Sequence, residues 1–366
     1  MKRKDLAKIA VGLCNKVLLK HERPELPEMT AKEWDKMLNF ASMQGILPII
    51  IQIFDKLTVK DDQTRMVIID WYGTAAESGT QYQMRVKTMR ELSKIFEKGK
   101  IDVMFMKGAT LAQLYLNPQW RVFDDIDFYL FGEFERGVKL MSEHGIENYT
   151  FPHHHTQAFL NDVMLENHYD FVERVNHRSD VVLDDALKAL AEKEGRNIPA
   201  AFLGDDIKNA YVMTPTMNAV FLMRHMSTHF ASETIPLRML YDWVLFLERQ
   251  GKEVDWQLVL KLYEQSGMMR FAGIIQQLVC LYLDYENKDC PIGLGKTEDA
   301  EMVWESIVNP PEQNPHGEGS LMSYLFETKT FFANRWKHKI VYPGESFVLL
   351  FFKYVWLGVK RMTRSI

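Results

Sequence analysis

Apolar side chains recur at three- and four-residue steps through the first hundred residues, the spacing that forms one face of a helix. The longest such stripe consists of Tyr82, Val86, Met89, Leu92, Ile95 and Phe96. Gly99 follows the stripe, and glycine is common just past the end of a helix. The pattern predicts an N-terminal helical region over residues 1–98.

The hydrophobic period changes from helix to strand after residue 100. Residues 101–106 form a short apolar run of strand length, and a short helix is expected between Gly108 and Pro118, because proline stops a helix. A period of two predicts the next strand. Its members are Asp125, Ile126, Asp127, Phe128, Tyr129 and Leu130. Residues 133–144 return to helical spacing and end before Gly145.

Two further strand candidates cover residues 157–160 and 163–172. They are separated by Asn161-Asp162, a pair that favours a tight hairpin turn. The resulting order of strand, helix, strand, helix and hairpin predicts a small mixed β-sheet over residues 99–205.

The chain after residue 206 is again helical in pattern. Helix starts are expected at Thr214-Pro215, near Pro236 and near Asp255, since threonine and aspartate cap helices and proline suits the first helical positions. These helices form a C-terminal region over residues 206–308. Prolines and glycines mark residues 309–320 as a linker or mobile loop, followed by a last helical segment at 321–366. The fold class is therefore α+β, a small mixed sheet flanked by N-terminal and C-terminal helical regions.

The bulk composition is that of an ordinary globular protein. The chain has 366 residues, of which 47% are hydrophobic and 25% charged, enough to bury a sizeable core. Its net charge of −5 provides no overall attraction to nucleic acid, so nucleic acid is not a favoured partner. Any nucleotide site has to be local and to draw its positive potential from a metal and a few basic residues.

Cysteine usage and the N-terminus favour a cytoplasmic location. Cys14, Cys280 and Cys290 are odd in number and far apart, which argues against a disulfide framework and against a C-x-x-C metal or redox site. The first apolar stretch is interrupted by Asp5 and Lys8, unlike a secretory signal.

The acidic pair Asp125 and Asp127 has the spacing of a metal site. Two residues apart on a strand, both side chains project from one face, about 6 to 7 Å apart at Cα. One divalent ion can bridge that gap. Magnesium prefers oxygen ligands and is commonly held by one or two carboxylates together with substrate phosphates.

This acidic pair lies within a larger group of candidate residues. Lys107 and Gly108 follow the first strand, Arg121 precedes Asp125 by four residues, and Glu166 alternates out of the later strand candidate. Glycine at a strand-to-helix turn lets backbone N–H groups approach phosphate oxygens. The two basic side chains would add cationic contacts to phosphate.

Two sequence blocks carry a family resemblance. They read Lys107-Gly108-Ala109-x-Leu111-Ala112-x-Leu114-Tyr115 and Arg121-x-x-x-Asp125-Ile126-Asp127-Phe128. Together with Glu166-x-His168, the helix carrying His225 and His229, and Pro236-Leu237-Arg238-x-x-x-Asp242, they resemble a bacterial family of uncharacterised nucleotidyltransferases in the DNA polymerase β-like superfamily. The resemblance spans most of residues 34–270.

The resemblance implies roles for individual residues. Asp125 and Asp127 take the places of paired metal ligands, and Glu166 takes the third acidic place, as a metal ligand or as the base for the acceptor hydroxyl. Nucleotide contacts are expected from Lys107, Gly108, Ala109, Thr110 and Arg121. The implied cofactor is Mg²⁺ or Mn²⁺, with a nucleoside triphosphate, ATP by expectation, as substrate.

The chain departs from the superfamily pattern at two places. Many members carry Gly-Ser after the first strand, whereas this chain has Gly108-Ala109, so a serine hydroxyl is replaced and Thr110 is a candidate substitute. Asn167 between Glu166 and His168 puts an amide where an apolar residue is expected.

Three other groups of residues have both a structural and a functional interpretation. His225 and His229, four residues apart on a helix, have a spacing that can hold zinc, but a packed pair is favoured and contact with the nucleotide pocket is the alternative. His153-His154-His155 is interpreted as a loop, with metal binding as the lesser alternative. The apolar stretch at 347–364 is shorter than the roughly 20 residues that span a bilayer, so core or subunit packing is preferred over a peripheral membrane contact.

The sequence thus predicts a metal-dependent nucleotidyltransferase. It would move a nucleoside monophosphate from a triphosphate to the hydroxyl of an unknown small-molecule, sugar or protein acceptor and release pyrophosphate. The competing hypothesis is a catalytically weak or inactive nucleotide-binding protein, regulatory or antitoxin-like, with the same fold.

Overall fold

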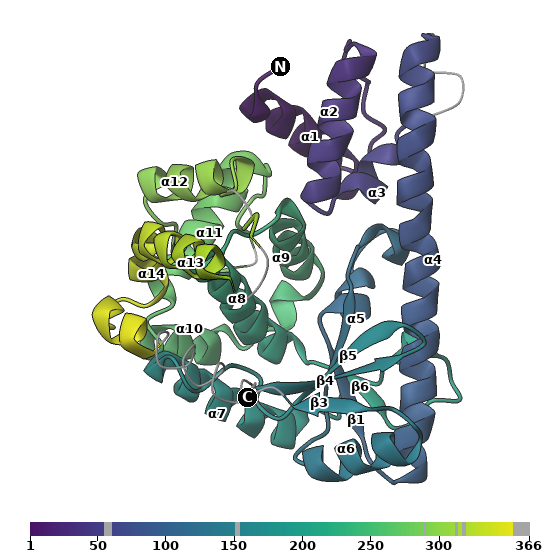
Figure 1. The fold of residues 1–366 in the computed structure, drawn as a ribbon, viewed down its shortest axis with the longest axis vertical. Helices are drawn as coiled ribbons and strands as arrows, with labels where there is room; N and C mark the ends of the chain where they lie inside the picture. Colours follow the sequence, from purple (N-terminus) through teal and green to yellow (C-terminus); the bar gives the residue numbers. More distant parts are fainter. Residues whose placement is uncertain (55–60, 151–153, 289, 312–313, 317–319, 354–366) are drawn as a thin grey trace.

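A computed structural model describes residues 1–54, 61–150, 154–288, 290–311, 314–316 and 320–353. In these ranges the chain forms one mixed six-stranded sheet with helices before and after it (Figure 1). The α+β class predicted from the sequence is confirmed.

The N-terminal region is helical, as predicted. Its elements are α1 (Arg3–Leu18), α2 (Ala31–Met43), α3 (Leu47–Ile51) and α4 (Asp62–Lys98). Thr30 caps α2 and Asp61 caps α4, each accepting a hydrogen bond from a backbone N–H of the first turn. In Figure 1 the first three helices lie beside one half of α4, and the sheet lies beside the other half.

The predicted strand, helix, strand, helix order is present. The elements are β1 (Val103–Met106), α5 (Gly108–Ala112), the 3₁₀ turn η1 (Pro118–Trp120), β2 (Asp125–Tyr129) and α6 (Phe134–Glu143). The helix after Gly108 is shorter than its pattern suggests.

The predicted hairpin consists of β4 (His155–Leu160) and β5 (Val163–His168). Asn161 and Asp162 form its turn with φ of 54° and 59°, the left-handed values that a two-residue turn with the twist of a hairpin requires. The second strand ends at His168, before the predicted limit of residue 172. A strand that the sequence pattern misses, β3 (Asn148–Thr150), pairs with the outer edge of β4.

The strand order is β3-β4-β5-β2-β1-β6. Strands β2 and β5 are parallel neighbours, β1 and β2 are antiparallel, and β6 (Ala210–Val212) runs parallel to β1. Strand β6 was not predicted, and it extends the sheet past residue 205, where the sequence places the end of the core.

The sheet separates two hydrophobic clusters. On one face Phe128 and Phe105 pack with Phe96 of α4. On the other face Met104 and Tyr129 join a larger cluster formed with helices that precede and follow the sheet. Alternate residues of β1 and β2 therefore belong to different cores, as the period of a strand requires.

The helices between and after the strands confirm the predicted starts. They are α7 (Arg178–Glu194), η2 (Ala201–Leu203), α8 (Pro215–Ser232), α9 (Leu237–Gln250), η3 (Gly251–Glu253), α10 (Trp256–Gln265), α11 (Met269–Tyr282) and α12 (Thr297–Val308). Thr214 caps α8 and Asp255 caps α10 through their side-chain oxygens.

The C-terminal part contains α13 (Leu321–Ala333) and α14 (Arg335–Val341). The described parts of the predicted linker are not helical, and residues 347–353 are helical. Most of the proposed 347–364 contact helix, from residue 354 on, lies outside the described residues. None of the helices in the described ranges combines the length and apolar character that a bilayer crossing requires.

Candidate active site

The predicted acidic residues lie on one face of two neighbouring strands. Asp127 of β2 is directly opposite Glu166 of β5. Asp125 is two residues before Asp127 on β2, and His168 is two residues after Glu166 on β5. All four side chains therefore lie on the same face of the sheet. The register that places Glu166 beside the acidic pair, which the sequence alone leaves open, is present in the structure.

Asp127 is the most buried of the carboxylates, with an exposed fraction of 1%. Its Oδ1 lies 2.7 Å from Lys107 Nζ and 2.9 Å from His168 Nε2. Its Oδ2 is buried and has no hydrogen-bond partner among the described residues. A buried carboxylate oxygen without a partner is costly, and a bound cation would satisfy it.

Lys107 is held among the three acidic residues. Burial lowers the pKa of Lys107, but the negative charges of Asp127, Asp125 and Glu166 outweigh burial and raise it. The ammonium group therefore stays charged and partly neutralises the acidic face.

Glu166 is ionised in this setting. Burial raises the pKa of its carboxyl, but the hydrogen bond with His168 and the charges of His155 and Lys107 lower it to about 2. His155 Nε2 is 3.5 Å from Glu166 Oε1. Such an acid is a good cation ligand at neutral pH and a weak proton acceptor.

The turn after β1 positions Lys107 beside β2. Lys107 has φ 45° and Gly108 has φ 39°, both in the left-handed region that glycine tolerates best. A side chain at Gly108 would meet Phe123 at 2.9 Å, so space and backbone both require glycine. Thr110 donates its hydroxyl to the Lys107 carbonyl at 2.6 Å and closes the turn.

Gly108 and Ala109 are the first two residues of α5. The N–H groups at the start of a helix have no acceptor within it, and this turn places them next to Lys107. The structure therefore brings the predicted nucleotide residues Lys107, Gly108, Ala109 and Thr110 together at one edge of the acidic face.

Arg121 has protein partners for its guanidinium. It donates two hydrogen bonds of 2.8 Å to the carboxylate of Asp242 on α9 and one of 3.0 Å to the Gly108 carbonyl. Both charged side chains are almost fully buried. Arg238 and Asp242 are four residues apart on α9, a spacing typical of a helical ion pair, but Asp242 pairs with Arg121, and Arg238 donates to the Val122 carbonyl.

One face of α8 lies across from the acidic residues. The Lys107 ammonium is 5.9 Å from the centre of the Phe221 ring, and the His225 ring stacks on Phe221 and contacts His229. Burial and then the charge of Lys107 lower the pKa values of His225 and His229. The two histidines are thus a packed neutral pair beside the site, the arrangement that the sequence favoured.

Two groups of potential metal ligands meet at this face. Within each, the candidate ligand atoms lie within 4.8 Å of one another. One group is Asp127, Glu166 and His168; the other is His154, His155 and His168. Asp125 is half-buried beside the first group and belongs to neither. Residue 153 lies outside the described residues, and His154 lies just before β4. His155 is the first residue of β4, so the loop predicted for this run is wrong at His155.

The sequence model of a family described as uncharacterised nucleotidyltransferase matches residues 30–284. The matched segment covers most of the chain and contains the whole sheet, the Lys107–Gly108 turn and α8. The chain belongs to this nucleotidyltransferase family. Neither the curated proteins nor the solved structures contain a match.

The residues of this nucleotidyltransferase fit the divalent ion that such enzymes use. Three carboxylates share a buried face, and one of their oxygens lacks a protein partner among the residues described. Oxygen donors of this kind suit magnesium or manganese. The arrangement of the acidic residues is thus the reason that this face fits a divalent ion.

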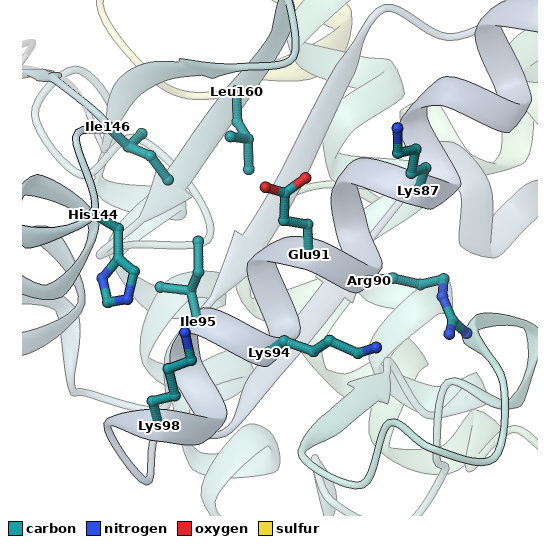
Figure 2. Close-up of a pocket in the computed structure, with 9 residues that line it drawn as sticks. All are labelled: Lys87, Arg90, Glu91, Lys94, Ile95, Lys98, His144, Ile146 and Leu160. Carbon is teal, nitrogen blue, oxygen red and sulfur yellow. The ribbon is translucent and has the colours of Figure 1, made fainter.

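A separate basic hollow lies along α4 (Figure 2). It is lined by Lys87, Arg90, Glu91, Lys94, Ile95, Lys98, His144, Ile146 and Leu160. It contains none of the residues predicted for the site, and two of its cations, Arg90 and Lys94, are paired with Asp206. The acidic face is therefore the candidate site that is considered below.

Proposed function

We propose that this protein transfers a nucleoside monophosphate from a nucleoside triphosphate, with ATP as the expected donor, to an acceptor hydroxyl. The observation that carries the proposal is the buried pairing of Asp127 with Glu166 beside the Lys107–Gly108 turn. Lys107 compensates this acidic face only in part, and buried carboxylates without full compensation cost folding energy. A bound divalent ion would add the missing positive charge.

Asp125, Asp127 and Glu166 are the residues that would hold the divalent ion, Mg²⁺ or Mn²⁺. When bound, such an ion neutralises the charge of the triphosphate and stabilises the entering and leaving oxygens of an in-line displacement. The pKa of about 2 for Glu166 favours its role as a ligand over its role as the base.

The phosphate contacts are proposed at the turn. Lys107 is the cation nearest to the acidic residues, and the N–H groups of Gly108 and Ala109 are donors of the kind that bind phosphate oxygens. We assign Arg121 a supporting role, because its guanidinium already binds Asp242 and the Gly108 carbonyl. It fixes the turn instead of contacting phosphate.

The reaction forms a bond between the acceptor oxygen and the α-phosphorus. The bond from the α-phosphorus to the bridging oxygen breaks, and pyrophosphate leaves with that electron pair. The acceptor proton passes to water. Exclusion of solvent by α8 and the buried position of Asp127 would protect the nucleotide from hydrolysis.

Label transfer tests the proposal directly. The full chain is incubated with Mn²⁺ or Mg²⁺, α-labelled triphosphates and a cell extract, and labelled acceptors are separated from free nucleotide. Transfer by the wild type that is lost in Asp127→Asn supports the proposal. The matched control is Asp124→Asn, because Asp124 is exposed and pairs with Arg85 outside the site.

Triphosphate binding without transfer in any extract would instead favour the nucleotide-binding regulatory protein. Absence of both metal-dependent binding and transfer would reject both hypotheses.

A further inference from the structure

His168 belongs to the family pattern described above but has no assigned role, and its ring lies between the site's carboxylates. Its ring is buried on β5, two residues after Glu166. Nε2 lies 2.9 Å from Asp127 Oδ1 and 3.7 Å from Glu166 Oε2. The ring therefore joins the two carboxylates that face each other across the strands.

The other ring nitrogen of His168 decides where a proton can reside. Nδ1 is 3.2 Å from the backbone carbonyl oxygen of Asp170. A carbonyl only accepts hydrogen bonds, so Nδ1 carries a proton. In a neutral ring Nε2 then has a lone pair, and that lone pair faces two carboxylate oxygens.

A lone pair that faces two anions requires a cation between them. A divalent ion in the same place would be bound by one nitrogen and two carboxylates. The Nδ1–H···O=C hydrogen bond is the support that metal-binding histidines commonly have.

We propose that Nε2 of His168 is a ligand of the divalent ion, together with Asp127 and Glu166. The inference rests on the proposed function, because it concerns the same ion. Imidazole is a better ligand for transition metals than for magnesium. The site therefore prefers Mn²⁺, Co²⁺ or Zn²⁺ over Mg²⁺.

The neighbouring histidine provides a matched control. His155 is also an imidazole near Glu166, and its Nε2 is 3.5 Å from Oε1, but it is not a member of the group formed by Asp127, Glu166 and His168. Replacement of either histidine by glutamine removes one imidazole near the same carboxylate. In His168→Gln the new side-chain amide can still donate to Asp127, which separates the loss of a ligand from the loss of a hydrogen bond.

Pulsed electron paramagnetic resonance of bound Mn²⁺ tests the assignment, because a directly coordinated nitrogen gives a ¹⁴N coupling. We expect this coupling in the full-length wild type and in His155→Gln, and its loss in His168→Gln. In parallel titrations His168→Gln should lower Mn²⁺ affinity at least about tenfold and leave Mg²⁺ affinity within about threefold, because magnesium gains little from imidazole.

Three results would overturn the assignment. They are a wild-type spectrum without ¹⁴N coupling, a coupling that persists in His168→Gln, or an equal loss of affinity for both metals, which is the result of a purely structural histidine. If His168→Gln does not fold, the other two spectra decide: a coupling retained in His155→Gln supports the assignment, and a coupling absent from the wild type or lost in His155→Gln overturns it.

A comparison with Asp127→Asn separates this inference from the proposed function. If Mn²⁺ binding depends on Asp127 but shows no nitrogen coupling, the assignment of His168 is wrong and the carboxylate site stands. If Mn²⁺ binding is unaffected by Asp127→Asn, the metal site of the proposed function is itself wrong.

Discussion

The two faces of the sheet are built from alternate residues of the same strands and have opposite chemistry. On the α4 side, Ile126, Phe128 and Leu165 are buried in an apolar cluster. On the α8 side, Asp127, Glu166 and His168 are packed together with the ammonium of Lys107. Both faces are covered by helices, so burial alone does not distinguish them.

The difference suggests different roles for the two faces. Apolar side chains gain free energy from burial, whereas a buried group of like charges loses it unless cations compensate. We therefore assign the apolar face to stability and propose the acidic face as the binding face. Substitutions on the two faces should therefore separate stability from binding.

The largest effect is expected from Asp127→Asn on the acidic face. Asparagine keeps the shape of the side chain but removes the charge that would bind the ion. We expect nucleotidyl transfer to fall by about a thousandfold or more, with a folded far-ultraviolet circular dichroism spectrum. Transfer within about tenfold of the wild type would show that this face is not the site.

On the apolar face, Phe128→Ala should act on stability. Phe128 is fully buried against Phe96 and Phe105, and truncation of such a ring costs about 3 to 5 kcal/mol. Urea unfolding measures this loss. Metal affinity of the folded protein should change by less than about threefold, and a much larger change would mean that the two faces are not independent.

Lys107→Met should move two affinities in opposite directions. Without the ammonium, metal binding in the absence of nucleotide should tighten by about tenfold, since one repulsive charge beside Asp127 is removed. Triphosphate binding should weaken by about tenfold. Calorimetric titration measures both affinities.

Arg85→Met is the control for Lys107→Met. It removes a positive charge near Asp125 that has no contact with Asp127. If metal binding tightened equally in both variants, the effect would be one of general charge. That result would contradict a specific role for Lys107 beside Asp127.

The smallest effect is expected at Asn167, a polar residue that is opposite Phe128 in the pairing of β5 with β2. Its side-chain amide is buried, and both polar atoms are without hydrogen-bond partners among the described residues. Asn167→Leu should raise the free energy of unfolding by about 1 kcal/mol and leave metal affinity unchanged. A destabilised variant would show that the amide has a partner after all.

Strands β1, β2, β4 and β5 and the acidic residues of the candidate site could be predicted from the sequence because their signals are local. A period of two placed Asp125 and Asp127 on one face, and the turn at Asn161-Asp162 fixed the hairpin. The same period of two placed His168 on the face of β5 that carries Glu166. Its contact with Asp127 also requires the parallel pairing of β2 with β5, which no local pattern specifies.

Contacts between distant segments were beyond the sequence pattern. Arg121 and Asp242 are 121 residues apart in the chain, so the local i, i+4 spacing of Arg238 and Asp242 does not identify the partner of Asp242. Strand β6 is three residues long, too short for a periodic signal. Its pairing with β1 follows from the tertiary arrangement.

The most direct test is a crystal structure of the full chain with Mn²⁺ and a non-hydrolysable nucleoside triphosphate, with anomalous scattering used to locate the metal. The account predicts a manganese peak bounded by Asp125, Asp127 and Glu166, with the phosphates at the Lys107–Gly108 turn. A manganese peak and a nucleotide bound elsewhere, with Lys107 still on Asp127, would contradict it.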